Sequence, residues 1–305
     1  MRKPPALKPG DKIGIIVPSS PVKEPFRSDG LNCIRELGYI PVEVENILSK
    51  ARSDFLAREP EQSLEDIRGF FNDPEIKAIW AARGGYGSNL LLPLLNRLEI
   101  PNPKIIIGSS DLSYLLWYLN SHFDMAVFYG PMAYSSLPEN RYNRDQLQKI
   151  LTGDNTGIKI EGKVLVPGKI KTAVTGGCLT NFVSLLGTPY FPEVKDRILL
   201  LEDTSERPYR LDRMFWQARQ AGIFSKIKGL LLGQFPGCFS NEAEKVNFLD
   251  RVQFYLNETN IPIIYDLPLG HGYNIHTLPL GIDIEIDTNV YPDIILSEKG
   301  VNTDL

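Results

Sequence analysis

Residues 104–120, KIIIGSSDLSYLLWYLN, constrain the fold more than any other stretch of the sequence. The three isoleucines at 105–107 form an apolar, β-branched run, which is typical of a strand buried on both faces. Gly108 permits a sharp turn, the Ser-Ser-Asp that follows suits the start of a helix, and leucines then recur at helical spacing. The stretch therefore predicts a buried strand, a tight turn and a helix.

A strand, a Gly-x-Ser turn and a helix together resemble a nucleophile elbow. In such a turn the serine hydroxyl, here that of Ser110, stands above the end of the strand and faces the helix N-terminus. Backbone N–H groups there can receive the oxyanion that forms when the hydroxyl attacks a carbonyl. Leu112 occupies the last glycine position of the G-x-S-x-G pattern, so plain helix capping is the alternative interpretation.

The composition is that of an ordinary globular protein. The chain has 305 residues, of which 43% are hydrophobic and 23% charged, enough for two domains with their own cores. A net charge of −4 and scattered Lys and Arg residues argue against a nucleic-acid partner. Because the sequence has neither the apolar run of a membrane span nor a signal-peptide pattern, we expect a cytoplasmic protein that does not bind membranes.

The cysteines and histidines give no sign of a metal site or a disulfide framework. The three cysteines are widely spaced and form no CxxC pair, and the three histidines include no HExxH motif. We therefore expect no metal and no other cofactor.

Strand and helix patterns alternate along the first half of the chain. The strand patterns predict a parallel sheet covered by helices on both faces, and they lie at 12–17, 39–44, 76–80, 105–107 and 125–129. Beyond about residue 150, stretches such as GIKIEGKVLV and GIDIEID alternate in a way that looks antiparallel. We predict an α/β fold with a Rossmann- or flavodoxin-like N-terminal domain, a linker, and a mixed, β-rich, barrel-like C-terminal domain, at 1–150, 151–170 and 171–305.

Residues 83–88, RGGYGS, follow one of the predicted strands and carry three glycines in four positions. Glycines allow a backbone to approach a ligand closely, or to point paired N–H groups at an anion. The loop has neither the Walker lysine nor the dinucleotide-binding spacing, so nucleotide binding is not its best interpretation. A flexible turn is the alternative.

A wholly apolar strand pattern ends at Glu202 and Asp203, which places a carboxylate at the carboxyl end of a strand. Such a carboxylate can orient an imidazole by accepting its N–H. A solvated acidic loop, or a turn capped by Asp203, is the alternative.

Residues 267–281, LPLGHGYNIHTLPLG, hold two of the histidines in a loop poor in regular structure. His271 lies between two glycines, so a purely core role is less favoured there than usual, and His276 is the competing candidate. Ser110, Glu202 and His271 then follow one another in one of the several chain orders by which unrelated folds build the same triad geometry. Because the serine belongs to the first predicted domain and the other two residues to the second, we expect the site in a cleft between domains.

The sequence resembles the LD-carboxypeptidase family of serine peptidases, which includes muropeptide carboxypeptidases and microcin C immunity peptidases. The resemblance spans nearly the whole chain and rests on stretches in family order: ARGGYGSNLLLPLL, IIGSSD, YGPM, GGCLTNFVSLLGTPY, ILLLEDTSERPYRLDR, GLLLGQF and LPLGHGYNIHTLPLG. It implies that Ser110 is the nucleophile, Glu202 the triad acid and His271 the base. It also implies a homodimer.

The resemblance further implies an oxyanion hole formed by the backbone N–H of Gly84 or Gly85 together with that of Asp111. Two positions depart from the family pattern: Tyr129 stands where histidine is frequent, and Cys178 where asparagine is frequent. These departures leave the identity of the substrate open.

The function that follows is a muropeptide LD-carboxypeptidase that removes a terminal D-alanine during cell-wall recycling. The carboxylate of the leaving D-amino acid needs a cation, which Arg83 or an arginine of the 207–213 segment can supply. One alternative is a microcin-type immunity peptidase that cleaves an aminoacyl-nucleotide amide. Another is a non-catalytic protein that holds a small ligand in its cleft.

Overall fold

The computed structural model describes residues 1–48, 51–134, 142–155, 158–288 and 293–304. The chain forms two compact units, each assembled from more than one stretch of sequence. Unit 1 consists of Met1–Asn155, Asn274–Gly281 and Lys299–Leu305, and unit 2 of Thr156–Tyr273 and Ile282–Glu298.

Unit 1 is built on a six-stranded sheet of order β12-β5-β4-β3-β1-β2. The predicted parallel arrangement is confirmed for the five strands from the first half of the chain: β1 (Lys12–Ile16), β2 (Ile40–Glu43), β3 (Ile76–Ala81), β4 (Ile105–Gly108) and β5 (Val127–Tyr129). The sixth strand, β12 (Leu278–Leu280), pairs antiparallel with β5 although it comes from near the end of the chain. The sheet is thus mixed, with one edge supplied from a distance.

The helices of unit 1 lie between its strands along the chain. They are α1 (Phe26–Glu36), α2 (Pro60–Asn72), the 3-10 helices η1 (Ser88–Arg97) and η2 (Ser110–Leu112), α3 (Ser113–His122) and α4 (Arg144–Thr152). Eight of the ten α3 side chains are buried, from Ser113 to Asn120, as expected of a helix that is apolar on most of its faces. This central helix begins directly after the Ser110 turn.

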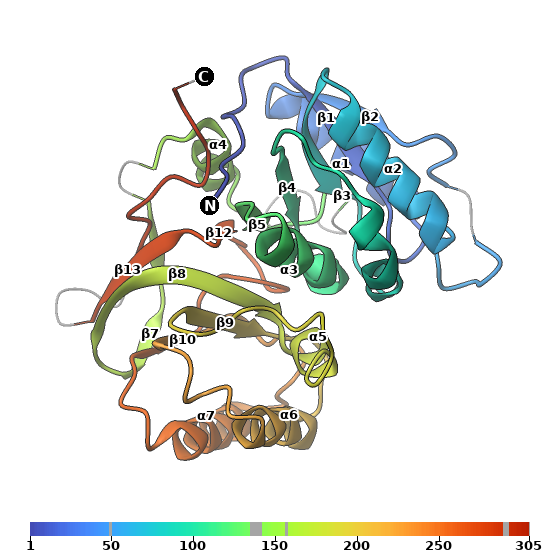
Figure 1. Cartoon of the computed structure of the whole chain (residues 1–305). Helices are drawn as coiled ribbons and strands as arrows, with labels where there is room; N and C mark the ends of the chain where they lie inside the picture. The colour runs from blue at the N-terminus through green and yellow to red at the C-terminus, as the bar shows by residue number, and fades with distance from the viewer. Residues whose placement is uncertain (49–50, 135–141, 156–157, 289–292, 305) are drawn as a thin grey trace. The chain divides into compact units, whose positions relative to one another are not determined.

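Unit 2 is built on an eight-stranded sheet of order β6-β14-β13-β8-β9-β10-β11-β7. Its centre is parallel and consists of β8 (Lys169–Cys178), β9 (Ile198–Glu202), β10 (Gly229–Leu232) and β11 (Ile263–Tyr265). The flanking strands are antiparallel to their neighbours: β6 (Lys159–Glu161), β7 (Lys163–Val166), β13 (Asp283–Asp287) and β14 (Asp293–Ile295). The central strand β8 is the longest strand of this sheet, and Figure 1 shows that it is strongly curved.

The C-terminal half is predicted to be barrel-like, but no ladder closes its sheet among the described residues. Within the described part of unit 2, no ladder joins the end strands β6 and β7, although only Gly162 separates them along the chain. β6 pairs with β14 and β7 pairs with β11, so the two consecutive strands lie at opposite ends of the sheet order. The sheet is therefore mixed, and its two end strands are joined through a single residue without pairing with each other.

The described residues of unit 2 form three helices: α5 (Leu179–Ser184), α6 (Pro208–Gln220) and α7 (Glu242–Leu256). Helices α6 and α7 pack against each other (Figure 1). Helix α7 was not predicted from the sequence, yet its start carries a capping signal. The side chain of Asn241 accepts a hydrogen bond from the Glu244 N–H at 3.0 Å, and the Glu244 carboxylate accepts one from the Ser240 N–H at 2.7 Å.

The two units divide the chain differently from the predicted domains. Strands β6 and β7 lie within the predicted linker 151–170, of which residues 156–157 lie outside the described residues. Two late segments, Asn274–Gly281 and Lys299–Leu305, belong to unit 1. The reason is strand pairing between distant residues, which local composition does not encode.

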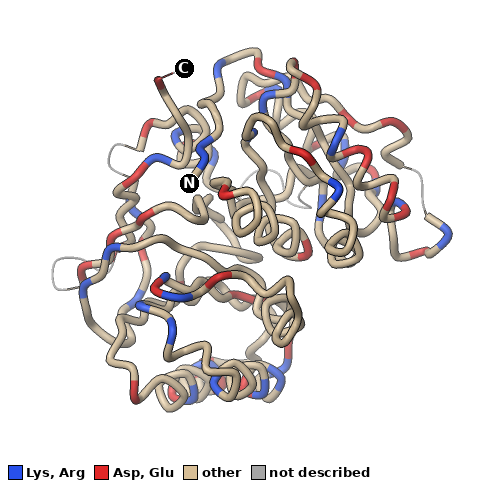
Figure 2. The backbone as a smooth tube through the Cα atoms, viewed as in Figure 1, with Lys and Arg blue, Asp and Glu red and all other residues tan. Residues whose placement is uncertain are grey.

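Acidic and basic residues are interspersed along both units (Figure 2), in keeping with the small net charge of −4. Among the residues that the structure describes, no helix combines the length and the apolar character needed to cross a membrane.

Candidate active site

Ser110 lies in a sharp turn between β4 and α3, as the strand–turn–helix pattern predicts. Its φ angle is +56°, in the left-handed region that residues with a side chain rarely adopt. Its N–H donates to the hydroxyl of buried Tyr129 at 3.4 Å, and its carbonyl accepts from Oγ of Ser113 at 2.6 Å. The backbone of Ser110 is therefore held on both sides in a strained conformation.

Leu112 explains why the turn departs from the G-x-S-x-G pattern. Its side chain is fully buried, and its Cδ2 occupies the space that a Cβ on Gly108 would need. The absence of a side chain at position 108 thus makes room for the leucine. The leucine packs against the end of β4, which gives the turn a tight fit without a second glycine.

The glycine loop of residues 83–88 passes directly beside Ser110. A Cβ placed on Gly84 would lie 2.9 Å from both Cβ and Oγ of Ser110. In the described part of the chain, the N–H groups of Gly84 and Gly85 donate no hydrogen bond. The N–H of Asp111 belongs to the first turn of a helix, where such groups lack an intrahelical acceptor. These are the three donors predicted for an oxyanion hole.

The carboxylate of Asp111 connects three loops at one edge of the unit 1 sheet. Its Oδ2 accepts from Oγ of Ser19 at 2.6 Å and from the N–H of Ser88 at 2.8 Å, and Oγ of Ser88 donates to the carbonyl of Asp111. Burial raises the pKa of Asp111, although these hydrogen bonds act in the opposite direction. The sequence suggested that Asp111 begins a helix and offers its backbone N–H, but not that its carboxylate binds two other loops.

Arg83 lies at the start of the same loop and is half-buried. Its Nη1 donates to the carbonyl of Pro21 at 2.9 Å, which joins the loop after β3 to the loop after β1. A guanidinium has five N–H donors, so this bond engages a small part of its capacity to bind a carboxylate.

Glu202 and His271 form a hydrogen-bonded pair in unit 2. Oε2 of Glu202 lies 2.7 Å from Nδ1 of His271 and 3.2 Å from the backbone N of the same residue. A carboxylate oxygen accepts hydrogen bonds, so the proton of the neutral imidazole resides on Nδ1 and leaves Nε2 as a base. The Glu202 side chain has no solvent exposure, and that of His271 has 16%. The imidazole thus extends from a buried anchor toward the surface.

Neighbouring glycines make room for this carboxylate. Gly270 has a φ of +95°, and a Cβ there would overlap the carboxylate of Glu202. A Cβ on Gly233 would lie 2.8 Å from Cβ of Glu202. Cys178 stands beside Glu202 in the β8–β9 register, and burial raises the pKa of its thiol.

The competing residues have other partners. Nε2 of His276 lies 3.3 Å from Nδ2 of Asn143 within unit 1, and burial lowers the pKa of this imidazole. Asp203 accepts hydrogen bonds from the N–H and the hydroxyl of Thr180 at 2.9 and 2.7 Å, at the start of α5. Asp203 therefore caps the start of helix α5, whereas the alternatives given for it from the sequence were a solvated acidic loop or a capped turn.

The structure brings the predicted site residues together in two groups. Unit 1 gathers Ser110, Gly84 and Asp111 at the carboxyl ends of its parallel strands, and unit 2 joins Glu202 to His271. Across the described ranges, no group of three or more His, Cys, Asp or Glu side chains could hold a metal ion.

Two sequence families cover most of the chain. The LD-carboxypeptidase N-terminal domain matches residues 13–130, and the LD-carboxypeptidase C-terminal domain matches residues 171–286. The chain belongs to the LD-carboxypeptidase family. The resemblance found in the sequence motifs is thereby confirmed.

Individual relatives support the same assignment. A murein tetrapeptide carboxypeptidase of Pseudomonas aeruginosa is 31% identical over 79% of this chain and 82% of its own. The microcin C7 self-immunity protein MccF of Escherichia coli is 26% identical over 98% of this chain and 96% of its own. Among solved structures, the muramoyltetrapeptide carboxypeptidase from Oxalobacter formigenes superposes with a TM-score of 0.80 at 26% identity, covering 93% of this chain and 97% of that one.

Proposed function

We propose that this protein is a serine carboxypeptidase that hydrolyses an L,D-amide bond and releases the terminal D-alanine of a muropeptide. Family membership and the relative in Pseudomonas aeruginosa support the reaction class. The observation that carries the proposal is the 2.7 Å hydrogen bond between Nδ1 of His271 and Glu202. It gives the imidazole the tautomer and the orientation that a general base requires.

In the proposed mechanism Nε2 of His271 removes the proton of the Ser110 hydroxyl as Oγ attacks the amide carbonyl. The tetrahedral oxyanion collapses to an acyl-enzyme, and His271 returns the proton to the leaving amine of D-alanine. Water then attacks the acyl-enzyme with the same histidine as base, and Ser110 recovers its proton. Glu202 fixes the imidazole and stabilises its protonated form.

The oxyanion is proposed to bind the N–H of Asp111 and that of Gly84 or Gly85. The proximity of Gly84 to Ser110 and the unused N–H groups of the loop support this role. Arg83 is proposed to bind the free carboxylate of the leaving D-alanine, as a guanidinium does with planar oxyanions.

The test is release of D-alanine from a muropeptide tetrapeptide, followed by mass spectrometry. Ser110→Ala should lower kcat at least about a thousandfold, as loss of a triad nucleophile does. Ser121→Ala, which changes an exposed serine on α3, is the matched control and should retain activity. His271→Asn should behave like Ser110→Ala, whereas His276→Asn should retain turnover. Full activity of Ser110→Ala would exclude the proposal.

A second candidate is a microcin-type immunity peptidase, favoured by the full-length similarity to the self-immunity protein of Escherichia coli. Aspartyl sulfamoyl adenosine tests it with the same variants: release of aspartate faster than release of D-alanine would make this the primary activity. If neither compound is cleaved and a serine-directed phosphonate does not label Ser110 in folded protein, a non-catalytic binding role remains.

We also propose that the protein is a cytoplasmic homodimer, as the family resemblance implies. Light scattering coupled to size-exclusion chromatography would show twice the 34.3 kDa chain mass, and a monomer mass would exclude the dimer.

A further inference from the structure

Two exposed aromatic side chains contact each other beside the glycine loop of unit 1. Phe55 and Tyr86 are 55% and 45% exposed, and their ring centroids lie 5.6 Å apart with an angle of 66° between the ring planes. Single exposed apolar residues are common on protein surfaces, whereas exposed apolar residues that join into a patch favour a binding site. We call these two residues the aromatic pair; the mechanism above uses neither side chain.

The backbone beneath the aromatic pair is held by the loop that follows β1. The N–H of Tyr86 donates to Oγ of Ser20 at 3.2 Å. The N–H of Ala57, two residues after Phe55, donates to the carbonyl of Ser19 at 2.9 Å. Because both rings are carried by loops that are bonded to the same third loop, the aromatic pair is preorganised for a ligand.

The aromatic pair lies close to the proposed nucleophile along the chain. A Cβ on Gly84 would meet Oγ of Ser110 at 2.9 Å, and Tyr86 follows Gly84 by two residues. The Cα atoms of Gly84 and Tyr86 are therefore at most about 7.6 Å apart. A molecule that reaches Ser110 can thus also reach the aromatic pair.

Arg83 and the aromatic pair lie toward opposite ends of the glycine loop. This loop contacts the loop after β1 in reverse order: Arg83 with Pro21, Gly85 with Ser20, and Gly87 with Pro18. The two loops therefore run side by side in opposite directions. Leu56, the neighbour of Phe55, lies against the Gly87 end. Since Arg83 is proposed to bind the leaving D-alanine, the aromatic pair is left for the acyl part of the substrate.

The angle between the two rings favours a ligand that is not flat. A flat nucleobase can stack on one of two rings that meet at 66°, but not on both. A pyranose chair has C–H groups on its faces and around its edge, so it can place some of them against each ring. Its remaining hydroxyl groups stay in water, because both rings are open to solvent.

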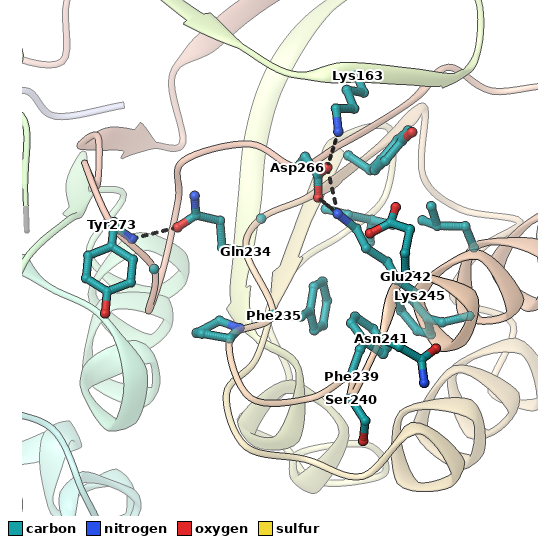
Figure 3. Close-up of a pocket in the computed structure, with 17 residues that line it drawn as sticks. Lys163, Gln234, Phe235, Phe239, Ser240, Asn241, Glu242, Lys245, Asp266 and Tyr273 are labelled. Carbon is teal, nitrogen blue, oxygen red and sulfur yellow. Dashed lines mark hydrogen bonds and ion pairs between the residues drawn. The ribbon is translucent and has the colours of Figure 1, made fainter.

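The proposed base in unit 2 has an exposed aromatic neighbour of its own. Tyr273 is 66% exposed and lines a pocket of about 650 Å³, in which Lys163 and Lys245 share the carboxylate of Asp266 (Figure 3). Its N–H donates to Oε1 of Gln234 at 2.9 Å, and among the described residues no other aromatic ring contacts it. Tyr273 is therefore a single ring, and it serves as the comparison for the aromatic pair.

We propose that the aromatic pair binds a hexopyranose ring that the substrate carries at the amino end of its peptide. The inference rests on the proposed function, because in a muropeptide the muramic acid is attached there. Three residues separate this sugar from the scissile bond, a span of about 10 Å in an extended peptide. Phe55 and Tyr86 are then specificity-determining residues, which distinguish a sugar-bearing peptide from a free one.

The experiment compares three substrates that share one tetrapeptide ending in D-alanine. The first has a free amino end, the second carries a D-lactoyl group there, and the third carries N-acetylmuramic acid through the same lactoyl link. The lactoyl peptide is the matched control, because it differs from the muramoyl peptide only in the sugar ring. For the wild-type protein we expect KM of the muramoyl peptide to be about tenfold lower than that of the lactoyl peptide, with equal kcat.

Leucine at either position keeps an apolar side chain but removes the flat ring. Phe55→Leu and Tyr86→Leu should each raise KM of the muramoyl peptide about tenfold and leave the other two substrates unchanged. Tyr86→Phe keeps the ring and should behave as the wild type. Phe254→Leu, at a residue of α7 that is 52% exposed, is the control and should alter no substrate. Tyr273→Leu should leave the preference for the sugar intact.

Three results would overturn the assignment and leave the peptidase intact. The first is equal KM of the muramoyl and lactoyl peptides in the wild type. The second is a lower kcat of Tyr86→Leu on all three substrates alike, which is the effect of a merely structural role in the glycine loop. The third is loss of the sugar preference in Tyr273→Leu but not in the aromatic-pair variants. A nucleobase as occupant would also overturn it: Tyr86→Leu would then raise KM for aspartyl sulfamoyl adenosine and not for the muramoyl peptide.

If no peptide is cleaved, the proposed function fails, and calorimetry with the Ser110→Ala protein decides the aromatic pair. Tighter binding of the muramoyl peptide than of the lactoyl peptide, abolished when Tyr86→Leu is added, would support the assignment. Equal binding of the two peptides, or no binding, would overturn it.

Discussion

Gly270 packs so closely against the carboxylate of Glu202 that a Cβ at position 270 would overlap it. Gly270 also has a φ of +95°, which favours glycine on backbone grounds alone. One residue thus provides both the space for the proposed triad acid and the turn that presents His271. An alanine at position 270 would therefore have two costs, the overlap of its Cβ with Glu202 and the strain of a positive φ, and a control glycine that has only the positive φ can separate them.

Gly270→Ala should therefore abolish most peptidase activity and lower the unfolding temperature. The matched control is Gly187→Ala, since Gly187 has a φ of +83° and nothing within 4 Å of its Cβ position. The control carries only the backbone cost of about 1–2 kcal/mol. Thermal unfolding and D-alanine release measure both variants; similar activities in the two would contradict the role of the clash.

Gly84→Ala should impair catalysis more than stability. The new Cβ would lie 2.9 Å from Cβ and Oγ of Ser110, closer than real Cβ contacts allow, so the serine has to move. Gly69→Ala in α2 is the control, because its Cβ meets nothing within 4 Å, and it should stabilise the protein by about 0.5–1 kcal/mol. We expect kcat of Gly84→Ala to fall at least about tenfold; wild-type kcat would show that the loop does not position the nucleophile.

Gly108 and Leu112 should show strong energetic coupling. Leu112→Ala removes a fully buried side chain and should cost about 2–5 kcal/mol, and Gly108→Ala places a methyl group against Leu112, at about 1–3 kcal/mol. The double variant should cost less than the sum, because the shortened side chain accommodates the new methyl group. Urea unfolding gives the three free energies, and strict additivity would refute the packing account of the incomplete G-x-S-x-G pattern.

Asp111 should reduce the stability of the protein as the pH rises. Its folded-state pKa is raised by burial, so the folded protein binds the proton more tightly than the unfolded chain does. Its contribution is therefore most favourable below about pH 3.9, the usual aspartate value, and falls as the pH rises through the raised pKa.

Asp111→Asn removes this titration, while Oδ1 of an asparagine can still accept the bonds from Ser19 and Ser88. The difference in unfolding free energy between variant and wild type should shift in favour of the variant between pH 4 and pH 7. A difference that is constant with pH, or that shifts toward the wild type, would contradict the raised pKa.

Much of the fold could be predicted because its signals are local. The buried isoleucines of β4, the turn at Gly108 and the leucines of α3 lie within one short stretch, and each acts through its own backbone or its near neighbours. The capping pair of Asn241 and Glu244 is equally local, so α7 was detectable although it was not predicted.

The site could be predicted in its residue types but not in its supporting contacts. Ser110 and the strand-end Glu202 follow from local patterns, whereas the choice of His271 over His276 depended on family motifs. The carboxylate bridge of Asp111 to Ser19 joins loops that are distant in sequence. No spacing rule predicts it, because it depends on three strands ending at the same sheet edge.

The sequence by itself determined the strands of the first half of the chain, the Ser110 turn, the family and the candidate triad residues, but it placed β12 in a loop poor in regular structure. Only the tertiary structure decided that β12 completes the sheet of unit 1, that Glu202 bonds to His271, and that Lys163 and Lys245 share Asp266. The physical reason is that secondary structure and capping arise between near neighbours along the chain. Ladders between distant strands, buried charges and pocket walls arise between residues that only folding brings into contact.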